Sequence, residues 1–165
     1  MDGKTLSFVR ASEEDAPLLS RLRQRMWATT YRGIYPDEEI DDYDYAVHEA
    51  RDLARLRDPA YRIFLVKDGE ESVGYFGLRC GETLYIQSLY FLPEYRRRGL
   101  GRRVFDLVKS CAAEQGRNSF CCSCNAHNEP ALAFYRAMGG RAVSEDLGHE
   151  NRQEDQIGLV FPVNE

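Results

Sequence analysis

The feature that most constrains the fold is a strand, a loop and a helix that follow one another between residues 83 and 115. TLYIQSLYFL (83–92) is a long, mostly apolar run that ends before Pro93, as expected of a strand. PEYRRRGLGRR (93–103) then gathers five arginines around a Gly-x-Gly. Apolar residues recur at helical spacing up to Gln115, which predicts a helix with one buried face. A strongly basic loop therefore enters the N-terminus of an amphipathic helix.

The remaining patterns predict an α/β protein with one domain over residues 1–165. Strands are expected where short apolar or alternating runs lie between turn residues, at 6–10, 63–67, 72–80, 119–125, 141–147 and 155–163. Helices are expected at 13–30, at 37–57 and from Pro130 to the glycine pair at 139–140. The predicted order of elements is β-α-α-β-β-β-α-β-α-β-β, which fits layers packed around one sheet.

The net charge and the hydropathy of the chain argue against two classes of function, nucleic-acid binding and membrane insertion. The formal net charge of -5 makes the chain as a whole repel nucleic acid, so the arginine cluster is a local exception. No apolar run approaches the ~18 residues of a membrane helix, and MDGKTLSFVR lacks the apolar core of a signal peptide. We therefore expect a cytoplasmic protein that binds neither nucleic acid nor a membrane, with its five cysteines reduced.

Three partners could balance the charge of the loop: a nucleic-acid backbone, a nucleotide phosphate, or solvent around a charged helix face. Free N–H groups at a helix N-terminus and arginine side chains both suit phosphate, and glycines let a ligand approach the backbone. The loop is not a Walker loop, because GxxxxGK[ST] is missing, and Val104 stands where the dinucleotide fingerprint needs a third glycine. The spacing that does fit a phosphate loop is Arg96-x-x-Gly99-x-Gly101.

This spacing, behind a strand that ends in Leu-Pro-Glu-Tyr, resembles the pyrophosphate-binding loop of the GNAT superfamily of N-acetyltransferases, which holds the diphosphate of acetyl-CoA. A second motif, NAHNEPALAFYRAMGG (125–140), is similar to a later signature of the family, with Asn128 and Tyr135 seven residues apart. The order of elements also matches along nearly the whole chain. The resemblance implies a mixed, mostly antiparallel central sheet with helices on both faces.

The resemblance also implies which residues bind the coenzyme and act on it. The strand that ends at Phe91 would splay from the strand at 119–125, and the pantetheine arm would pair with its exposed edge. The Leu89 N–H would point at the thioester oxygen, and Tyr135 would protonate or hydrogen-bond the departing sulfur. The residues implied in coenzyme binding are Leu89, Tyr90, Phe91, Arg96, Arg97, Arg98, Gly99, Leu100, Gly101, Arg102, Asn128 and Tyr135. An Asn before a helix is also a routine cap, and the alternative for the Tyr of AFY is that it packs in a core.

The general base is not assigned. In ribosomal-protein N-terminal acetyltransferases, a branch of the family, a Glu stands where this chain has Ser123, and serine accepts a proton poorly at neutral pH. In other members the base lies near Tyr85 or Gln87, and neither of these is a carboxylate. Two routes stay open: an acceptor amine that arrives already deprotonated, or a water relay to an acid. The candidate acids are Glu38, Glu39, Asp41 and Glu82.

The segment WATTYRGIYPDEEIDDYDY (27–45) corresponds to one wall of the acceptor site in the family. Its aromatic side chains could line a pocket, and its acids could attract a cationic amine such as a polyamine or a lysine-like side chain. The alternative is that the tryptophan packs in the core and that DEEIDD is a solvated helix start. The candidate acceptor-site residues are Trp27, Tyr31, Tyr35, Glu38, Tyr85 and Gln87.

CCSC at 121–124, followed by His127, is the one pattern that resembles a metal site. A structural zinc needs four ligands, usually as two separated pairs, and the sequence has no second Cys/His pair. We therefore interpret these cysteines as buried strand residues and expect no metal.

The resemblance to the GNAT superfamily implies an acetyl-CoA-dependent N-acetyltransferase, in which an amine of a small molecule or peptide attacks the thioester directly in a ternary complex. Acetyl-CoA is the expected co-substrate, and the assembly is left open, with a homodimer among the options. Two alternatives stand beside this prediction. One is a non-catalytic acyl-CoA-binding or sensing domain on the same fold, and the other is a nucleic-acid-binding protein that uses the arginine cluster.

Overall fold

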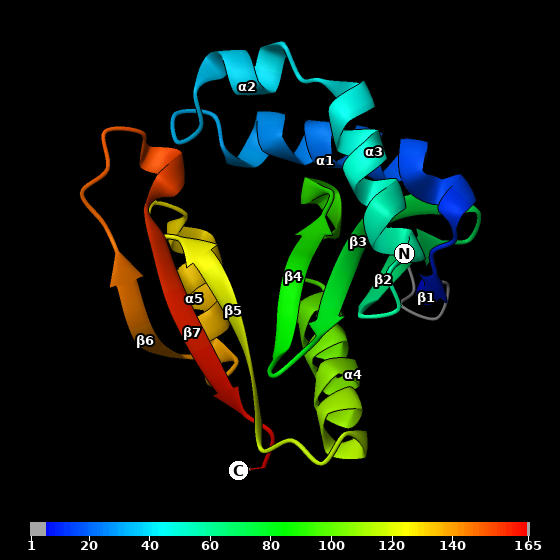
Figure 1. Cartoon of the computed structure of the whole chain (residues 1–165), viewed down its shortest axis with the longest axis vertical. Helices are drawn as coiled ribbons and strands as arrows, with labels where there is room; N and C mark the ends of the chain where they lie inside the picture. Colours follow the sequence, from blue (N-terminus) through cyan, green and yellow to red (C-terminus); the bar gives the residue numbers. More distant parts are fainter. Residues whose placement is uncertain (1–5, 165) are drawn as a thin grey trace.

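The computed structural model describes residues 6–164, and within them seven strands form one sheet in the order β1-β2-β3-β4-β5-β7-β6 (Figure 1). The strands are β1 (Leu6–Arg10), β2 (Tyr61–Asp68), β3 (Glu71–Cys80), β4 (Leu84–Phe91), β5 (Ser119–Asn125), β6 (Arg141–Asp146) and β7 (Gln156–Pro162). The helices are α1 (Ala16–Thr30), α2 (Asp37–Asp41), α3 (Tyr45–Arg57), α4 (Leu100–Glu114) and α5 (Glu129–Ala137). The α/β class predicted from the sequence is confirmed.

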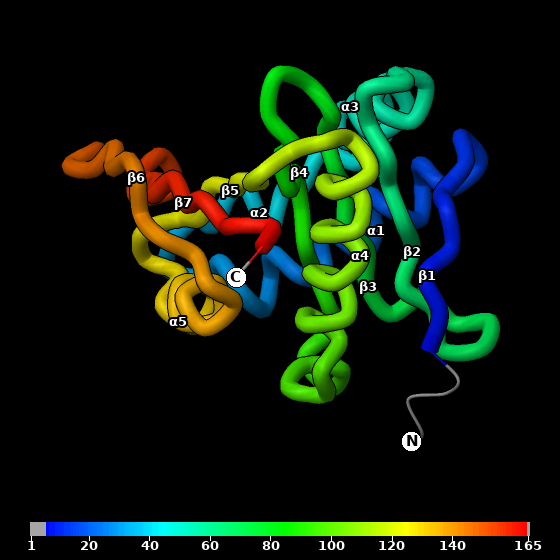
Figure 2. The backbone as a smooth tube through the Cα atoms, turned by 90° about the horizontal axis from the view of Figure 1, so that it is seen from below, coloured from blue at the N-terminus to red at the C-terminus, as the bar shows by residue number. Residues whose placement is uncertain are grey.

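Two neighbouring residues of β3 show that helices cover both faces of the sheet. Tyr75 packs under α1, where the Arg23 guanidinium lies 5.6 Å from the centroid of its ring. Phe76 points to the opposite face. There it meets the ring of Phe8 at 5.1 Å, and Arg103 of α4 lies over that ring. Thus α1 covers one face and α4 the other, while Figure 2 shows α5 next to β6 and β7.

The sheet splits between β4 and β5. All other neighbouring strands pair antiparallel, whereas β4 and β5 run parallel and share two residue pairs, Tyr85 with Cys121 and Ile86 with Cys122. Gln87 follows as a bulge, because the β3–β4 register shifts there. Beyond this point the two strands diverge, and α1 and α2 lie across the open end of the fork (Figure 1).

The segment predicted as one helix at 37–57 is two helices, so that prediction is corrected. The chain leaves α2 at Asp41 and starts α3 after Asp44, whose side chain accepts the N–H of Val47 at 3.1 Å. An Asp that caps a new helix in this way competes with continuation of the old one. A buried ion pair then holds α3 on α1, with 2.6 Å between Arg23 Nη2 and Asp52 Oδ1.

The cysteines are free thiols. Cys122 and Cys124 are buried in β5, as predicted, whereas Cys121 is half-buried. Burial raises the pKa of the Cys122 and Cys124 thiols to about 12, so both are uncharged at neutral pH. Among the described residues, no group of three or more His, Cys, Asp or Glu side chains could hold a metal ion. Over the same residues, no helix is both long enough and apolar enough to span a membrane.

Candidate active site

A cavity of about 790 Å³ occupies the fork between β4 and β5. The ends of both strands line it, together with the loop before α4 and the residues at the C-terminus of α1. Helix α5 closes one side through Ala131, Phe134 and Tyr135. The volume lies in the range of small-molecule sites. One compartment therefore brings together the two motifs that the sequence singled out.

The hydrogen-bond ladder shows which backbone groups of β4 face the cavity. The Leu92 N–H bonds to the Val73 carbonyl of β3 at 2.9 Å. In an antiparallel ladder, alternate residues direct both their N–H and their C=O groups to the same neighbouring strand. Tyr90 therefore also faces β3, whereas Leu89 and Phe91 direct these groups toward β5, which has already diverged. The N–H groups of Leu89 and Phe91 thus face the fork.

The loop before α4 combines backbone N–H groups with arginines. Arg97 and Gly99 have positive φ angles of 60° and 78°, and Gly99 is the N-cap of α4. No described side chain caps this helix, so the N–H groups of its first turn are free to meet a ligand. Arg97 and Arg102 line the cavity, whereas Arg98 lies over the Tyr95 ring at 5.0 Å and is not part of the lining. The positive end of the helix and these arginines suit an anion.

Arg96, the first residue of the predicted phosphate motif, lines the cavity but is held by the protein itself. Its Nε donates to the Phe91 carbonyl oxygen at 3.2 Å, and its Nη2 donates to Thr30 Oγ1 at 2.9 Å. These bonds join the loop to the end of β4 and to the last residue of α1. A contact between Arg96 and a phosphate stays a prediction.

The two glycines of the motif differ in what they do. Gly99 has the positive φ that a side chain would strain. At Gly101, a Cβ atom would lie 2.4 Å from Cζ of Phe134, so glycine here lets α4 and α5 approach each other. From the sequence we predicted that both glycines let a ligand approach the backbone. At Gly101, the close contact with α5 is a second reason for a glycine.

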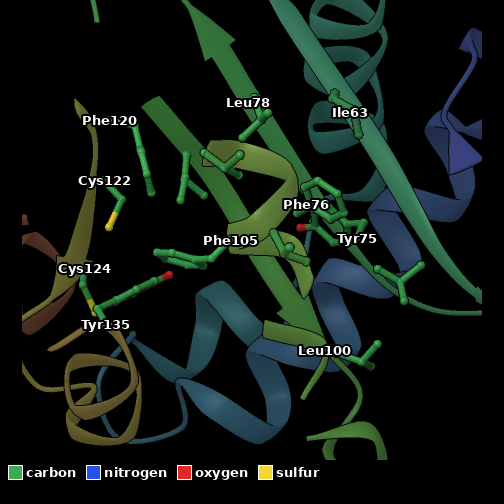
Figure 3. Packing of buried hydrophobic residues seen from close by; sticks show 14 of the residues in the cluster. Ile63, Tyr75, Phe76, Leu78, Leu100, Phe105, Phe120, Cys122, Cys124 and Tyr135 are labelled. Atoms are coloured by element: carbon green, nitrogen blue, oxygen red, sulfur yellow. The ribbon is translucent and has the colours of Figure 1, made fainter. Parts of the chain in front are cut away.

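Helix α5 begins at a capping Asn and carries Tyr135 to the cavity. The Asn128 side chain accepts the N–H of Ala131 at 3.3 Å, so its role as a cap is observed. Tyr135 is 9% exposed and lies beside Cys124, with its ring directed toward Phe105 (Figure 3). Burial raises the pKa of the Tyr135 phenol well above its usual value, so the hydroxyl keeps its proton at neutral pH. Tyr135 is therefore both a core residue and a lining residue.

Known proteins resemble this chain in sequence and in fold. The family model described as Acetyltransferase (GNAT) family matches residues 20–139, which is more than half of the chain. The chain belongs to the GNAT acetyltransferase family. It is therefore an acyltransferase, and the fold that the sequence motifs implied is confirmed.

Individual GNAT relatives differ in how much of the chain they match. Thialysine N-epsilon-acetyltransferase of Sus scrofa is 30% identical over 77 residues, which are 46% of this chain and 45% of that protein, so less than half of the relative is covered. An uncharacterized N-acetyltransferase of Lactobacillus delbrueckii subsp. lactis is 23% identical over 163 residues, 91% of this chain and 94% of the relative. The structure of PaiA N-acetyltransferase from Thermoplasma acidophilum in complex with coenzyme A has a TM-score of 0.82 and 16% identity, covering 95% of this chain and 98% of that one.

The cavity gathers most of the predicted site residues of this GNAT chain. Those that line it are Leu89, Tyr90, Phe91, Arg96, Arg97, Gly99, Leu100, Gly101, Arg102, Asn128 and Tyr135 from the coenzyme set, and Tyr31, Tyr35, Tyr85 and Gln87 from the acceptor set. Trp27 is 8% exposed and meets the Tyr35 ring edge-on at 5.0 Å behind the wall, which agrees with the core interpretation. Glu38 is exposed on α2 and lies outside the lining, as does Arg98.

Among the lining residues that the sequence did not assign to the site are two amides, Asn125 and Gln156. Asn125 ends β5 and Gln156 begins β7, and the two strands pair so that these residues lie opposite each other. The Asn125 amide donates to the backbone carbonyls of Arg152 at 3.0 Å and Gln153 at 3.2 Å, which orients it at the cavity. Asn125 begins the quoted motif at 125–140, whereas Gln156 reaches the cavity through pairing between distant segments, so no local pattern marks it.

Proposed function

We propose that this GNAT chain transfers an acetyl group from acetyl-CoA to a primary amine, which attacks the thioester directly inside the cavity. One observation carries the proposal. The same cavity is lined by the arginine-glycine loop, by the edge of β4 that holds Leu89, by Tyr135, and by the tyrosines that follow α1. Groups suited to a diphosphate, a thioester carbonyl, a leaving sulfur and an acceptor thus share one space.

The lining residues fit coenzyme A. The N–H groups at the start of α4, together with Arg97 and Arg102, offer hydrogen-bond donors to a diphosphate. The backbone groups of Leu89 and Phe91 offer the pairing that an extended pantetheine arm needs. Because the Phe91 carbonyl already accepts from Arg96, we expect the arm to depend mainly on Leu89 and on the Phe91 N–H. The coenzyme A complex of the PaiA relative supports this assignment.

When bound, acetyl-CoA would supply the acetyl group as a thioester, and two groups of this chain would act on it. The Leu89 N–H donates a hydrogen bond to the carbonyl oxygen, which gains negative charge as the amine attacks. A backbone donor placed in this way typically contributes about 3 kcal/mol to the stabilisation of the transition state. The Tyr135 hydroxyl, which burial keeps protonated, donates to the sulfur as it departs.

The Tyr135→Phe variant tests the proposal. The phenol acts on the departing sulfur, whereas the ring alone fills the core. We therefore expect kcat to fall by about 100-fold while the affinity for coenzyme A changes little. Thiol release with a panel of amines measures the first quantity, and calorimetric titration with coenzyme A measures the second. The matched control is Tyr45→Phe at an exposed position of α3, which should keep the kcat of the parent protein.

Different outcomes would contradict the role of Tyr135 and the proposed reaction. An unchanged kcat in Tyr135→Phe would remove Tyr135 from the mechanism. If no amine releases thiol from acetyl-CoA with the parent protein, the proposed function itself is wrong.

A further inference from the structure

The charged residues of the cavity wall are all cationic. Within residues 6–164, they are Arg96 and Arg97 from the loop before α4 and Arg102 from the first turn of α4. The rest of the polar lining consists of phenols, amides and hydroxyls, among them Gln87 and Gln156. An ammonium group that entered this space would give up its water and meet no carboxylate among the described lining residues, which is costly. A neutral amine would meet hydrogen-bonding groups instead.

The acidic residues of the segment after α1 lie outside the cavity lining. Arg32 donates to Asp37 at 3.2 Å and to Asp41 at 2.9 Å, on the outer surface of α2. Glu38 and Glu39 are exposed and lie outside the lining. The idea that these acids draw a cationic acceptor into the cavity is therefore not supported by where they lie.

The aromatic wall is also arranged for an apolar group rather than for a cation. Tyr31 and Tyr35 stack face to face, with ring centroids 4.2 Å apart and an angle of 11° between the ring planes. Trp27 meets the Tyr35 ring edge-on behind them. A cation–π contact needs a ring face open to the cation, and the faces joined in this stack are closed. Stacked rings of this kind suit a flat apolar group.

The phenols of the wall hold their protons. Burial raises the pKa of Tyr31, Tyr35 and Tyr90, so each is a neutral hydroxyl at physiological pH. Such hydroxyls can hydrogen-bond a neutral amine, but they do not take a proton from an ammonium.

We infer that the acceptor is a weakly basic primary amine, such as the α-amino group of an amino-acid amide or a peptide, next to an aromatic or apolar side chain. This inference rests on the proposed function and names its acceptor class. The amine nitrogen forms a bond to the acetyl carbon, the carbon–sulfur bond breaks, and the proton that the nitrogen loses ends on the sulfur. Atoms and charge then balance without a further reactant.

The pKa of an acceptor amine determines which fraction of it is neutral at a given pH. At pH 7.5, an α-amino group with a pKa of about 7.8 is about one-third neutral, whereas a lysine-like amine with a pKa of about 10.4 is about one-thousandth neutral. Raising the pH to 9.5 increases the neutral fraction of the strong base about 90-fold and that of the α-amine about threefold. A preference that arises from neutrality must therefore fall as the pH rises.

Phenylalaninamide and 2-phenylethylamine form a pair of probes that share the ring and the two-carbon link to the amine. The carboxamide of phenylalaninamide makes its amine the weaker base. At pH 7.5 we expect kcat/KM for phenylalaninamide to be at least about tenfold higher than kcat/KM for 2-phenylethylamine. The same difference is expected between phenylalaninamide and spermidine. The ratio of kcat/KM for phenylalaninamide to kcat/KM for 2-phenylethylamine should fall by about 30-fold between pH 7.5 and pH 9.5, because the neutral fractions of the two amines converge. Thiol release from acetyl-CoA measures each value.

A carboxylate added to the wall should change this preference. Gln87→Glu keeps the shape of the side chain and adds a negative charge at the bulge of β4. We expect it to raise kcat/KM for 2-phenylethylamine relative to phenylalaninamide by about tenfold at pH 7.5. Gln115→Glu makes the same change at the C-terminal end of α4, outside the lining, and should leave the ratio unchanged.

Two results would overturn the inference and leave acetyl transfer intact. One is a preference for spermidine or 2-phenylethylamine at pH 7.5, and the other is a ratio that does not change with pH. If coenzyme A binds but no amine releases thiol at any pH, the proposed function fails instead. An unchanged selectivity in Gln87→Glu would also count against the inference.

Discussion

At the scale of single residues, Asp155 holds the loop between β5 and α5. The residue is 5% exposed, and its side chain pairs through Oδ2 with His127 Nε2 at 2.7 Å and accepts the His149 backbone N–H through Oδ1 at 3.0 Å. Its backbone carbonyl accepts the Ala126 N–H at 2.9 Å. Because this loop leads directly into the Asn128 cap, the position of α5 at the cavity depends on these contacts.

Asp155→Asn should destabilise the protein in a pH-dependent way. The hydrogen bond with His127 holds the pKa of Asp155 below its usual value of about 4. The carboxylate therefore stabilises the fold above that pH, and this contribution is lost as the pH falls through the lowered pKa of the folded protein. We expect a lower free energy of unfolding at pH 7 and a difference that shrinks below about pH 4.

Urea titrations of both proteins at several pH values measure that difference. Asp146→Asn is the control, because Asp146 is an exposed carboxylate that pairs with His149, and its effect should be smaller. A cost of Asp155→Asn that is the same at pH 7 and pH 3 would show that the charge of Asp155 is not its cause.

At the scale of elements, the close approach of β3 and β4 sets one wall of the fork. A Cβ atom at Gly74 would lie 2.4 Å from the Tyr90 carbonyl oxygen, which belongs to the backbone and cannot turn away. At Gly77 the nearest atom is Ser88 Oγ at 3.0 Å, and that side chain can rotate. Two glycines of one strand therefore constrain β4 to different degrees.

Gly74→Ala should damage both the fold and the site. The new methyl group pushes β4 away at Tyr90, between the two residues whose N–H groups face the fork. We expect a loss of stability of about 1–3 kcal/mol and weaker binding of coenzyme A. Gly77→Ala introduces the same methyl group beside a side chain that can move, so both losses should be smaller. Scanning calorimetry and titration with coenzyme A compare the variants, and equal losses would contradict this account of β4.

At the scale of the whole molecule, the sheet is two halves joined at one end. β1–β4 and β5–β7 share the two pairs between β4 and β5. Near that junction Phe105 of α4 packs on Phe120 and Phe161, with ring centroids 5.6 Å and 5.0 Å away. At the open end, Arg152 Nη1 donates to the Gly33 carbonyl at 3.1 Å. The cavity separates the halves over the rest of the fork, so a ligand that contacts both of them should stiffen the molecule.

Coenzyme A should therefore raise the melting temperature and slow amide exchange in both halves. A ligand present at 100 times its dissociation constant adds about 2.7 kcal/mol to the free energy of unfolding. We expect slower exchange at the end of β4, in the first turn of α4 and at the start of α5. Hydrogen exchange followed by mass spectrometry measures these segments, with adenosine as a control that lacks the diphosphate and the arm. Protection confined to one half would contradict the proposed bridging.

The amino-acid sequence by itself was sufficient for features that depend on near neighbours along the chain. The strand before Pro93, the glycine at the start of α4 and the Asn128 cap could all be predicted, because a turn or a cap is decided by a few adjacent residues. The helix predicted at 37–57 was wrong in one respect, since Asp44 caps a new helix inside an otherwise continuous pattern.

Only the tertiary structure decided which residues share the cavity. Gln156 reaches it through the register of β7 against β5, and Trp27 is excluded because the rings of Tyr35 and Tyr43 cover it. The fork itself arises because β4 and β5 stop pairing after Ile86. Strand register and divergence are set by packing between segments far apart in the chain, and a local pattern carries no information about that packing.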